Sequence, residues 1–471
     1  MSAATPLHAW IAGAALALAA SVQAAEGVKL PPVHRAQLAN GAQVALVEKR
    51  DTPLVAMTIT VRGGALGDAP GKEGTASLFA DLIQKGSGER NAAQFAEAVE
   101  TAGGSLVASA GSESLGIRAS FMARDVDLML ELAGDALQRP ALASDEFEKA
   151  RTLAIQSIAA AKDSDPRALI ASYGDAWLFR GHPYGRPVGG SEGTLAAVTL
   201  EDVQRFYAAH VGGDRTIITV VGDIDARAMS SKLERAFGGW RKAGAPTPRA
   251  PAPQAVSGRR VLLVDKPGAT QTYFWLGNVG ASRTDPARTQ QTVVNTAFGG
   301  RYTSMLNTAL RIDSGLTYGV SAGFDRASQP GAYQVSSYTQ TESTVQAVDL
   351  ALATLERLRR DALDAPTLAS AKSYLLGQFP PTLETNGQLA GRLADLLFYG
   401  LGPEDVDEYA QRVAAVDAAA VRSAIERAFP KPADLAIVLI GDADRIRAQV
   451  GKYGPVTEMK ITDPHFAPPR T

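Results

Sequence analysis

The sequence predicts an α+β fold made of two similar domains, each a mixed, mainly antiparallel sheet with helices packed on one face. Three observations support this fold class. A chain of 471 residues is too long for one ordinary hydrophobic core. The same helix–strand pattern closes each half of the chain, and a proline-rich segment separates the two halves. Sheets with helices on one side are the expected product of such a pattern, made twice.

The repeated pattern is an amphipathic helix followed by an apolar strand that ends in Gly-Asp-x-Asp. It occupies residues 198–225 in the first half and residues 416–444 in the second. The aspartates could mark a calcium site or simply a turn at the end of the strand. So few carboxylates form a poor calcium shell without further oxygen ligands, so we expect a turn.

The elements of the first half can be predicted in order. Apolar and polar residues alternate near 42–48 and 55–62, which indicates two strands. The next expected elements are a helix near 75–85, a helix near 91–102, two strands near 105–122 and a long helix near 124–137. The second half is expected to follow the same order.

Residues 241–257 are the clearest linker. Four prolines fall within eight residues of this segment, and proline forbids a regular helix or a central strand. We therefore place the two domains at 30–240 and 258–450. Residues 451–471 are left as a tail without an assigned function.

Composition excludes several classes of function. The net charge of −2 gives no reason to expect nucleic acid or an anionic membrane surface as a partner. The absence of cysteine excludes disulfides, thiolate catalysis and cysteine-based zinc sites. No two histidines lie three or four residues apart, so no helix can present a histidine pair to a metal ion. The five histidines are His8, His34, His182, His210 and His465.

The N-terminus is typical of an export signal. Residues 10–20 form a short apolar core, and Val22-Gln23-Ala24 supplies a small-x-small cleavage site. The apolar run is too short to span a bilayer comfortably. We expect a signal peptide over residues 1–24 and a periplasmic or secreted bacterial protein, with an uncleaved N-terminal anchor as the alternative.

Residues 74–87 read Gly-Thr-Ala-Ser-Leu-Phe-Ala-Asp-Leu-Ile-Gln-Lys-Gly-Ser. This segment resembles the zinc-binding helix of the pitrilysin/insulinase metallopeptidases, which reads roughly G-x-A-H-F-L-E-H-M-x-F-K-G-T. In that family the inverted motif H-x-x-E-H places two histidine ligands on one helical face, with the base glutamate between them. Here the three positions hold Ser77, Ala80 and Asp81. The alternative is an ordinary solvated helix, but the flanking Gly74 and residues 85–87 match the family frame.

The resemblance also identifies the position of the third zinc ligand, a glutamate in a later helix similar to E-R-x-V-V-L-x-E-I. The matching residues 150–158 place Ser157 there. One aspartate and two hydroxyl groups are too weak a donor set for zinc, and Ala80 cannot act as a base. We therefore expect no catalytic residue and no metal in this chain. An enzyme with a nonstandard metal site is the remaining alternative.

Residues 298–320 contain Phe-Gly-Gly-Arg-Tyr-Thr-Ser and later Leu-Arg-Ile-Asp-Ser-Gly-Leu-Thr-Tyr. They resemble the family's glycine-rich segment and its L-R-x-x-x-G-L-x-Y pattern. In the family, an arginine and a tyrosine from this pattern reach into the catalytic chamber of a facing unit. Arg311 and Tyr318 match those positions, and a guanidinium and a phenol can donate hydrogen bonds to a substrate carbonyl and its oxyanion. The alternative is that Arg311 caps a helix and Tyr318 packs at a strand edge.

The stretch Gly103-Gly104-Ser105 resembles the start of the family's G-G-x-x-N-A-x-T edge strand, to which extended peptides add by main-chain hydrogen bonds. Val107 replaces the usual asparagine. An edge strand that only ends the sheet is the alternative.

The segment 181–187, Gly-His-Pro-Tyr-Gly-Arg-Pro, also resembles the family. Its histidine, His182, is a possible ligand by residue type. However, proline and glycine make this segment a tight loop, and no second ligand is near in sequence. We expect a structural loop.

Family members of this length resemble half of a clam-shell peptidase chamber, in which one subunit supplies zinc and the other supplies the arginine and tyrosine. The expected function is therefore a non-catalytic partner subunit of a periplasmic heterodimeric zinc peptidase, orienting peptide or unfolded protein. Zinc is expected in a similar-sized partner that carries H-x-x-E-H. The alternative is a peptide-binding or scaffold protein without a proteolytic role.

Overall fold

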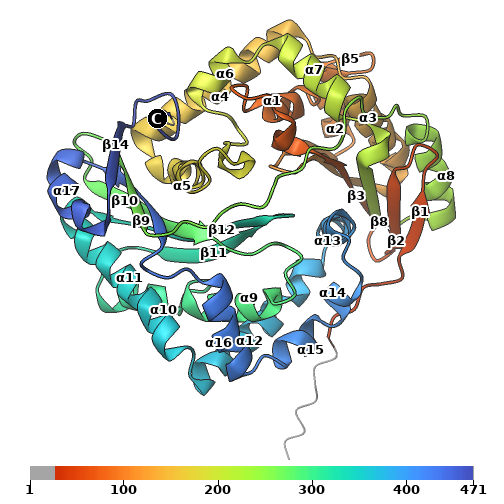
Figure 1. Cartoon of the computed structure of the whole chain (residues 1–471). Helices are drawn as coiled ribbons and strands as arrows, with labels where there is room; N and C mark the ends of the chain where they lie inside the picture. Colours follow the sequence, from red (N-terminus) through yellow and green to blue (C-terminus); the bar gives the residue numbers. More distant parts are fainter. Residues whose placement is uncertain (1–26, 470–471) are drawn as a thin grey trace, which may run out of the picture.

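Two six-stranded sheets, one in each half of the chain, form the framework of the computed structural model, which describes residues 27–469 (Figure 1). In spatial order, the first sheet contains β1 (His34–Gln37), β2 (Gln43–Glu48), β8 (Thr216–Gly222), β3 (Leu54–Arg62), β7 (Ser114–Met122) and β6 (Ser105–Ala110). The second contains β11 (Val320–Arg326), β12 (Pro330–Gln340), β10 (Gln271–Val279), β13 (Leu435–Gly441), β9 (Arg259–Asp265) and β14 (Val456–Lys460).

Five strands of each sheet share one topology, β2-β8-β3-β7-β6 matching β9-β13-β10-β12-β11, and the edge strands β1 and β14 differ, which confirms the predicted fold class. In each sheet, the strand that ends in Gly-Asp-x-Asp lies inside, parallel to one neighbour and antiparallel to the other. All residues of β8 and β13 are buried. Pairing is antiparallel except at β2–β8, β9–β13 and β9–β14. A short ribbon of β4 (Gly86–Ser87) and β5 (Arg90–Asn91) lies outside both sheets.

The helices pack mainly against the sheet of their own half. The first half contains α1 (Thr75–Leu82), α2 (Ala92–Thr101), α3 (Val126–Gln138), α4 (Ser144–Ser164), α5 (Ile170–Leu178), α6 (Glu192–Ala197), α7 (Leu200–His210) and α8 (Ala226–Phe237). The second half contains α9 (Arg288–Phe298), α10 (Met305–Asn307), α11 (Thr344–Asp361), α12 (Ala365–Gln378), α13 (Asn386–Tyr399), α14 (Glu404–Asp407), α15 (Tyr409–Ala414), α16 (Ala418–Ala428) and α17 (Ala443–Val450). The elements predicted between residues 42 and 137 correspond to β2, β3, α1, α2, β6, β7 and α3.

One helix from each half crosses to the other half and covers the second face of its sheet. Helix α5 packs on β10 and β13, and helix α13 packs on β3 and β8 (Figure 1). Gly174 lets α5 approach closely, because a Cβ atom there would lie 2.5 Å from Cε2 of Trp275. On the other side, the Thr219 hydroxyl of β8 donates to the carbonyl of Ala390 in α13 at 2.8 Å. The sequence did not predict this exchange.

The segment after residue 450 is part of the second domain, which corrects the predicted tail. Val456–Lys460 forms β14, which pairs with β9. Phe466 is 4% exposed and its ring meets that of Tyr173 edge-on at 4.9 Å. Sequence reasoning missed this strand because it is short and stands among proline, glycine and charged residues.

The segment 241–257 contains no helix or strand, and residues from both halves hold it. The side-chain amide of Asn278 donates to the carbonyl of Val256 at 2.9 Å, and its oxygen accepts from the amide of Val256 at 2.8 Å. From the first half, the guanidinium of Arg215 donates to the carbonyl of Ala245. The linker is therefore fastened along its length.

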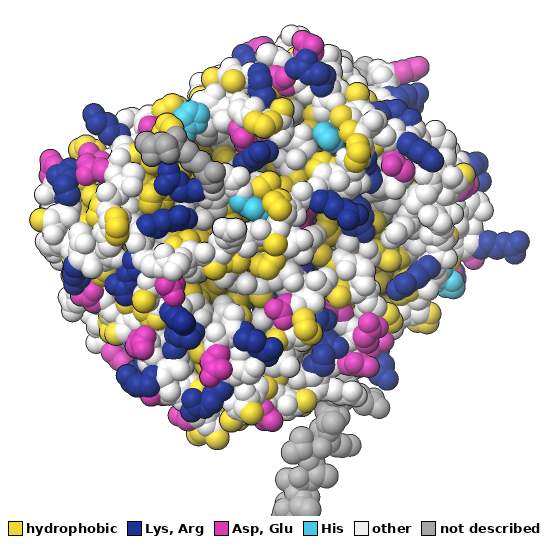
Figure 2. Space-filling view, in the orientation of Figure 1, with side chains coloured by type: hydrophobic (Ala, Val, Ile, Leu, Met, Phe, Trp, Pro, Cys, Tyr) yellow, Lys and Arg dark blue, Asp and Glu magenta, His cyan; other side chains and the backbone are white. Residues whose placement is uncertain are grey.

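The visible surface is mixed in charge. Figure 2 shows acidic and basic side chains interspersed over one face, consistent with the net charge of −2. None of the helices within residues 27–469 combines the length and the apolar character that a membrane crossing requires. The predicted signal peptide, residues 1–24, lies outside the described residues.

Because α13 completes the first sheet, we expect Leu393→Ala to destabilise the whole chain. Leu393 is 3% exposed in the cluster that joins α13 to β2 and β8, and such a truncation costs about 2–5 kcal/mol. Urea unfolding followed by tryptophan fluorescence and circular dichroism should show one transition at lower urea. The matched control is Leu153→Ala, which removes a side chain that is 65% exposed and should change stability little. Two separate transitions, only one of them moved, would contradict the interlocked arrangement.

Candidate functional site

A capping loop fixes where helix α1 begins. Gly74 adopts φ 102°, and a Cβ atom there would lie 2.8 Å from Cδ2 of Leu195. The buried carboxylate of Asp68 accepts hydrogen bonds from the amides of Gly74 and Ala76, both at 2.9 Å. Burial raises the pKa of Asp68 to about 7, because the two hydrogen bonds offset only part of the lost hydration. Gly74, which matches the family pattern, is therefore required by the structure of this loop.

The three positions that correspond to H-x-x-E-H have different environments. Ser77 is partly buried, and its hydroxyl donates to the carbonyl of Val188 at 3.1 Å. Ala80 is 1% exposed and belongs to the first core. Asp81 is exposed. The small methyl group of Ala80 is covered by the surrounding core.

These residues do not fit a zinc ion. Ser157 is exposed on α4, and within residues 27–469 no three His, Asp or Glu side chains lie together as a metal site would require. Asp81 is the one carboxylate among the four positions. The surrounding protein removes part of its hydration, which raises its pKa, while Lys85 acts in the opposite direction. A single carboxylate is a poor ligand set for zinc.

Strand β6 lies at the free edge of the first sheet, beside α1. Among the described strands it pairs only with β7, and on its outer side the carbonyl of Ala108 accepts from Nε2 of Gln84 at 3.3 Å, a contact that an added strand would have to replace. Ser105 begins β6, and Gly103 and Gly104 form the turn before it. Val107 is 58% exposed, so its side chain offers an apolar contact instead of the expected amide. The edge has the geometry for peptide addition.

Arg311 is held between two exposed tyrosines. Its guanidinium carbon lies 4.3 Å from the ring centroid of Tyr318 and 4.8 Å from that of Tyr302. Tyr318 is 73% exposed and Tyr302 is 59% exposed. Arg311 itself is half-buried, and no carboxylate in the described part of the chain pairs with it. Within the described residues, Arg311 is seen in contact with these two rings, and most of the Tyr318 side chain is open to solvent.

The local backbone presents this stack. Residues Thr308–Asp313 form a wide π-helical turn that carries Arg311 outward. Asn307 braces the turn, because its side-chain amide donates to the carbonyl of Val320 at 2.9 Å. Sequence reasoning missed Tyr302 as a third member of the site. The only available signal was an aromatic residue just after Gly-Gly-Arg, and no helical or strand spacing relates it to Arg311.

The contacts of His182 are those of a residue that holds a loop in place. Nδ1 of His182 accepts from the amide of Tyr184 at 3.1 Å, and Nε2 lies 2.9 Å from the carbonyl oxygen of Pro251. Both ring nitrogens are thus occupied, one of them by the linker. A metal ion would have to displace one of these contacts.

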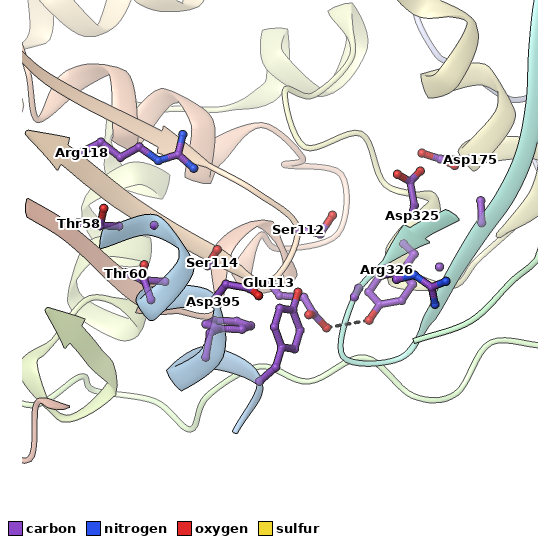
Figure 3. Close-up of a pocket in the computed structure, with 18 of the residues that line it drawn as sticks. Thr58, Thr60, Ser112, Glu113, Ser114, Arg118, Asp175, Asp325, Arg326 and Asp395 are labelled. Atoms are coloured by element: carbon purple, nitrogen blue, oxygen red, sulfur yellow. Dashed lines mark hydrogen bonds between the residues drawn. The ribbon is translucent and has the colours of Figure 1, made fainter. Parts of the chain in front are cut away.

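The two halves meet around a polar cavity of about 420 Å³ (Figure 3). Glu113, at the turn between β6 and β7, accepts from the hydroxyl of Tyr184 at 2.7 Å. It also accepts from the amide and the hydroxyl of Ser328, at the turn between β11 and β12, both at 2.8 Å. One carboxylate therefore ties the hairpin turns of the two sheets together.

Two further carboxyl groups lie close together on the far side of this cavity, Asp175 from α5 and Asp325 from β11 (Figure 3). Burial raises the pKa of Asp175 to about 8, and the charge of Asp325 adds to the shift. Burial also raises the pKa of Asp325. Near neutral pH, the pair therefore retains a proton.

The comparisons with known proteins agree with this geometry. A model described as insulinase (peptidase family M16) matches residues 43–192, and one described as peptidase M16 inactive domain matches residues 197–375. An uncharacterized zinc protease of Mycobacterium tuberculosis (strain H37Rv) is 28% identical over 325 residues, covering 68% of this chain and 73% of that protein. One from Streptomyces coelicolor is 24% identical over 415 residues, covering 86% and 89%.

Solved structures share the fold. The crystal structure of a peptidase M16 inactive domain from Pseudomonas fluorescens matches with a TM-score of 0.81 at 20% identity, covering 87% of this chain and 98% of that chain. A protease from Helicobacter pylori matches with a TM-score of 0.79 at 19% identity, covering 87% and 100%. A duplicated α+β fold with a zinc-helix frame that lacks its ligands defines a metallopeptidase homologue. The chain belongs to peptidase family M16, the pitrilysin/insulinase family.

We expect the purified chain, incubated with zinc chloride and desalted, to retain far less than stoichiometric zinc by plasma mass spectrometry. The physical reason is the donor set, one carboxylate and hydroxyl groups. Asp81→Ala should retain the same small amount. Stoichiometric zinc that is lost in Asp81→Ala would show that a nonstandard site exists.

We expect stability to fall as pH rises, with Asp175 as a major cause. Because its folded pKa is about 8 against an ordinary 3.8, folding takes up a proton between about pH 4 and 8, and this stabilisation is lost as pH rises through 8. Between pH 6 and pH 8, the loss from this group is about 2 kcal/mol. Urea unfolding of Asp175→Asn should show a shallower pH dependence. Asp68 titrates in both proteins, so the difference reports on Asp175 together with its neighbour Asp325; equal slopes would contradict the assignment.

Proposed function

We propose that this chain is the non-catalytic subunit of a periplasmic two-chain zinc peptidase. The observation that carries the proposal is a contrast within one chain. The positions for zinc ligands and the base hold Ser77, Ala80, Asp81 and Ser157, whereas Tyr318 is exposed and the half-buried Arg311 forms no ion pair within the described residues. The zinc positions lack ligands and a base, but the arginine–tyrosine pair retains its hydrogen-bond donors. This combination supports a complex in which a second chain supplies the zinc site.

The exposed stack supplies suitable chemistry for orienting a peptide. A guanidinium with free N–H groups and a phenol can hold a substrate carbonyl and the oxyanion that forms on attack. The ring contacts with Tyr302 and Tyr318 restrict the guanidinium, which lowers the entropy lost when substrate binds. Zinc and its activated water would belong to a partner that carries H-x-x-E-H.

Three further observations support the role. The outer edge of β6 pairs with no described strand and suits an extended peptide. The export signal expected from the sequence supports a periplasmic location. The relatives named above are described as zinc proteases, which makes a related catalytic chain the natural partner. A peptide-binding or scaffold role without proteolysis is the second candidate, favoured because residues 27–469 contain no cluster of potential metal ligands.

The first experiment is a tagged pull-down of the mature chain from periplasmic extract of its own host, with mass spectrometry of co-eluting proteins. Stoichiometric recovery of a similar-sized H-x-x-E-H protein supports the peptidase role. Recovery of the chain alone favours the scaffold role.

In the reconstituted complex, we expect Arg311→Ala to lower kcat/KM for peptide cleavage by about 10²-fold, because a transition-state donor is lost. Tyr318→Phe removes only a hydroxyl group and should give a smaller loss. Arg422→Ala, an exposed arginine on α16, is the matched control. Gel filtration must show that each complex still assembles. Full cleavage by an assembled Arg311→Ala complex would refute the orienting role.

A further inference from the structure

A second pocket, far along the chain from the degenerate zinc helix, is unusually rich in arginine. It has a volume of about 330 Å³ and lies among α9, α12, α13 and α15 (Figure 1). Asp405 is its single lining carboxylate. The five lining arginines are Arg283, Arg288, Arg326, Arg392 and Arg412.

The carboxylates nearby are already shared among several of these arginines. Asp405 is 8% exposed and accepts from Nη2 of Arg283 at 2.9 Å and from Nε of Arg288 at 3.1 Å. Burial works to raise the pKa of Asp405, but these hydrogen bonds outweigh it and hold the pKa below its ordinary value. Asp395 accepts from Arg283 at 2.7 Å and lies 4.0 Å from Arg392.

Two arginines keep donors that nothing in the described chain accepts. Nη2 of Arg326 and Nε of Arg412 are buried without a hydrogen-bond partner. Nη1 of Arg326 donates only to the carbonyl of Ser282, at 3.3 Å. Burial lowers the pKa of Arg326 to about 10, with Arg283 and Arg288 adding to the shift and Asp285 opposing it. Unsatisfied buried donors next to like charges are costly unless an anion joins them.

Carboxylates outside the lining balance part of this charge, and among the described residues Arg326 is the lining arginine without an ion pair. Glu408 lies 3.7 Å from Arg412 at the outer side of α15. Asp285 is used locally, because it accepts from the amide of Ala287 at 2.7 Å and from the side chain of Gln291 at 3.2 Å. The pocket itself therefore presents five guanidinium groups and one carboxylate.

We propose that this pocket binds a small oxyanion, either a phosphate group or a carboxylate, carried by a compact organic molecule. Planar guanidinium forks match both groups. The volume exceeds that of a bare phosphate, and one wall is apolar, since the rings of Phe379 and Tyr409 stack at 4.0 Å. The site does not depend on the proposed role in proteolysis.

An anion bound in this pocket would also affect how the two halves of the chain are held together. Arg392 and Asp395 are on α13, the helix that crosses to the first sheet. Asp405 and Arg412 are on α14 and α15. A bound oxyanion would join these helices through charge-assisted hydrogen bonds and so stabilise the interlock of the two halves.

The test is thermal unfolding and calorimetry with inorganic phosphate, and separately with succinate, against sodium chloride of equal ionic strength. We expect either anion to raise the Tm by about 2 °C or more at 10 mM, beyond the effect of chloride. A shift with phosphate alone assigns a phosphate site, and a shift with succinate alone assigns a carboxylate site. No shift beyond chloride with either anion overturns the proposal.

Variants locate the effect. Arg392→Gln removes the arginine with the weakest ion pair, so the fold should survive, and it should weaken anion binding about tenfold. Arg412→Lys keeps the charge but loses the fork and provides a second test. Arg427→Gln, an exposed arginine on α16, is the matched control and should bind as the native chain does. Unchanged binding by both folded pocket variants would place the anion elsewhere and refute the site.

Discussion

The exchange of helices α5 and α13 is the constraint on which the rest of the structure depends. A sheet buries two faces, and each half supplies helices for only one of them. The second face is covered by a helix that reaches across from the other half. Neither sheet can therefore complete its core alone, and the cavity, the linker and both candidate sites take their positions from this mutual burial.

The same framework separates two kinds of functional position. Helix α1 keeps its cap and its buried face, so the fold does not need the lost zinc chemistry. The Arg311 stack lies on a turn outside the core, where packing does not dictate which side chains are present. Packing explains why Ala80 is tolerated beneath the surface, and solvation explains why the two tyrosines beside Arg311 can remain exposed.

Local patterns predicted much of this molecule because local physics decides it. Alternation and helical periodicity located the elements between residues 42 and 137, and the doubled Gly-Asp-x-Asp strand indicated two domains. Long-range effects could not be predicted in this way. The crossing of α5 and α13, the place of Val456–Lys460 in a sheet, the buried Ala80 and the stacking of Tyr302 on Arg311 all depend on which distant surfaces meet. No spacing within a segment encodes that choice.

The hydrogen bonds of Glu113 have a consequence for recognition. They fasten the turn that follows β6 to the turn that follows β11, so the open strand edge and the segment leading from the arginine–tyrosine stack belong to one stiff body. A partner that touches both would meet them at a fixed separation and angle. The conformational freedom that such an encounter would otherwise remove is already lost during folding, so association begins from a surface shaped in advance.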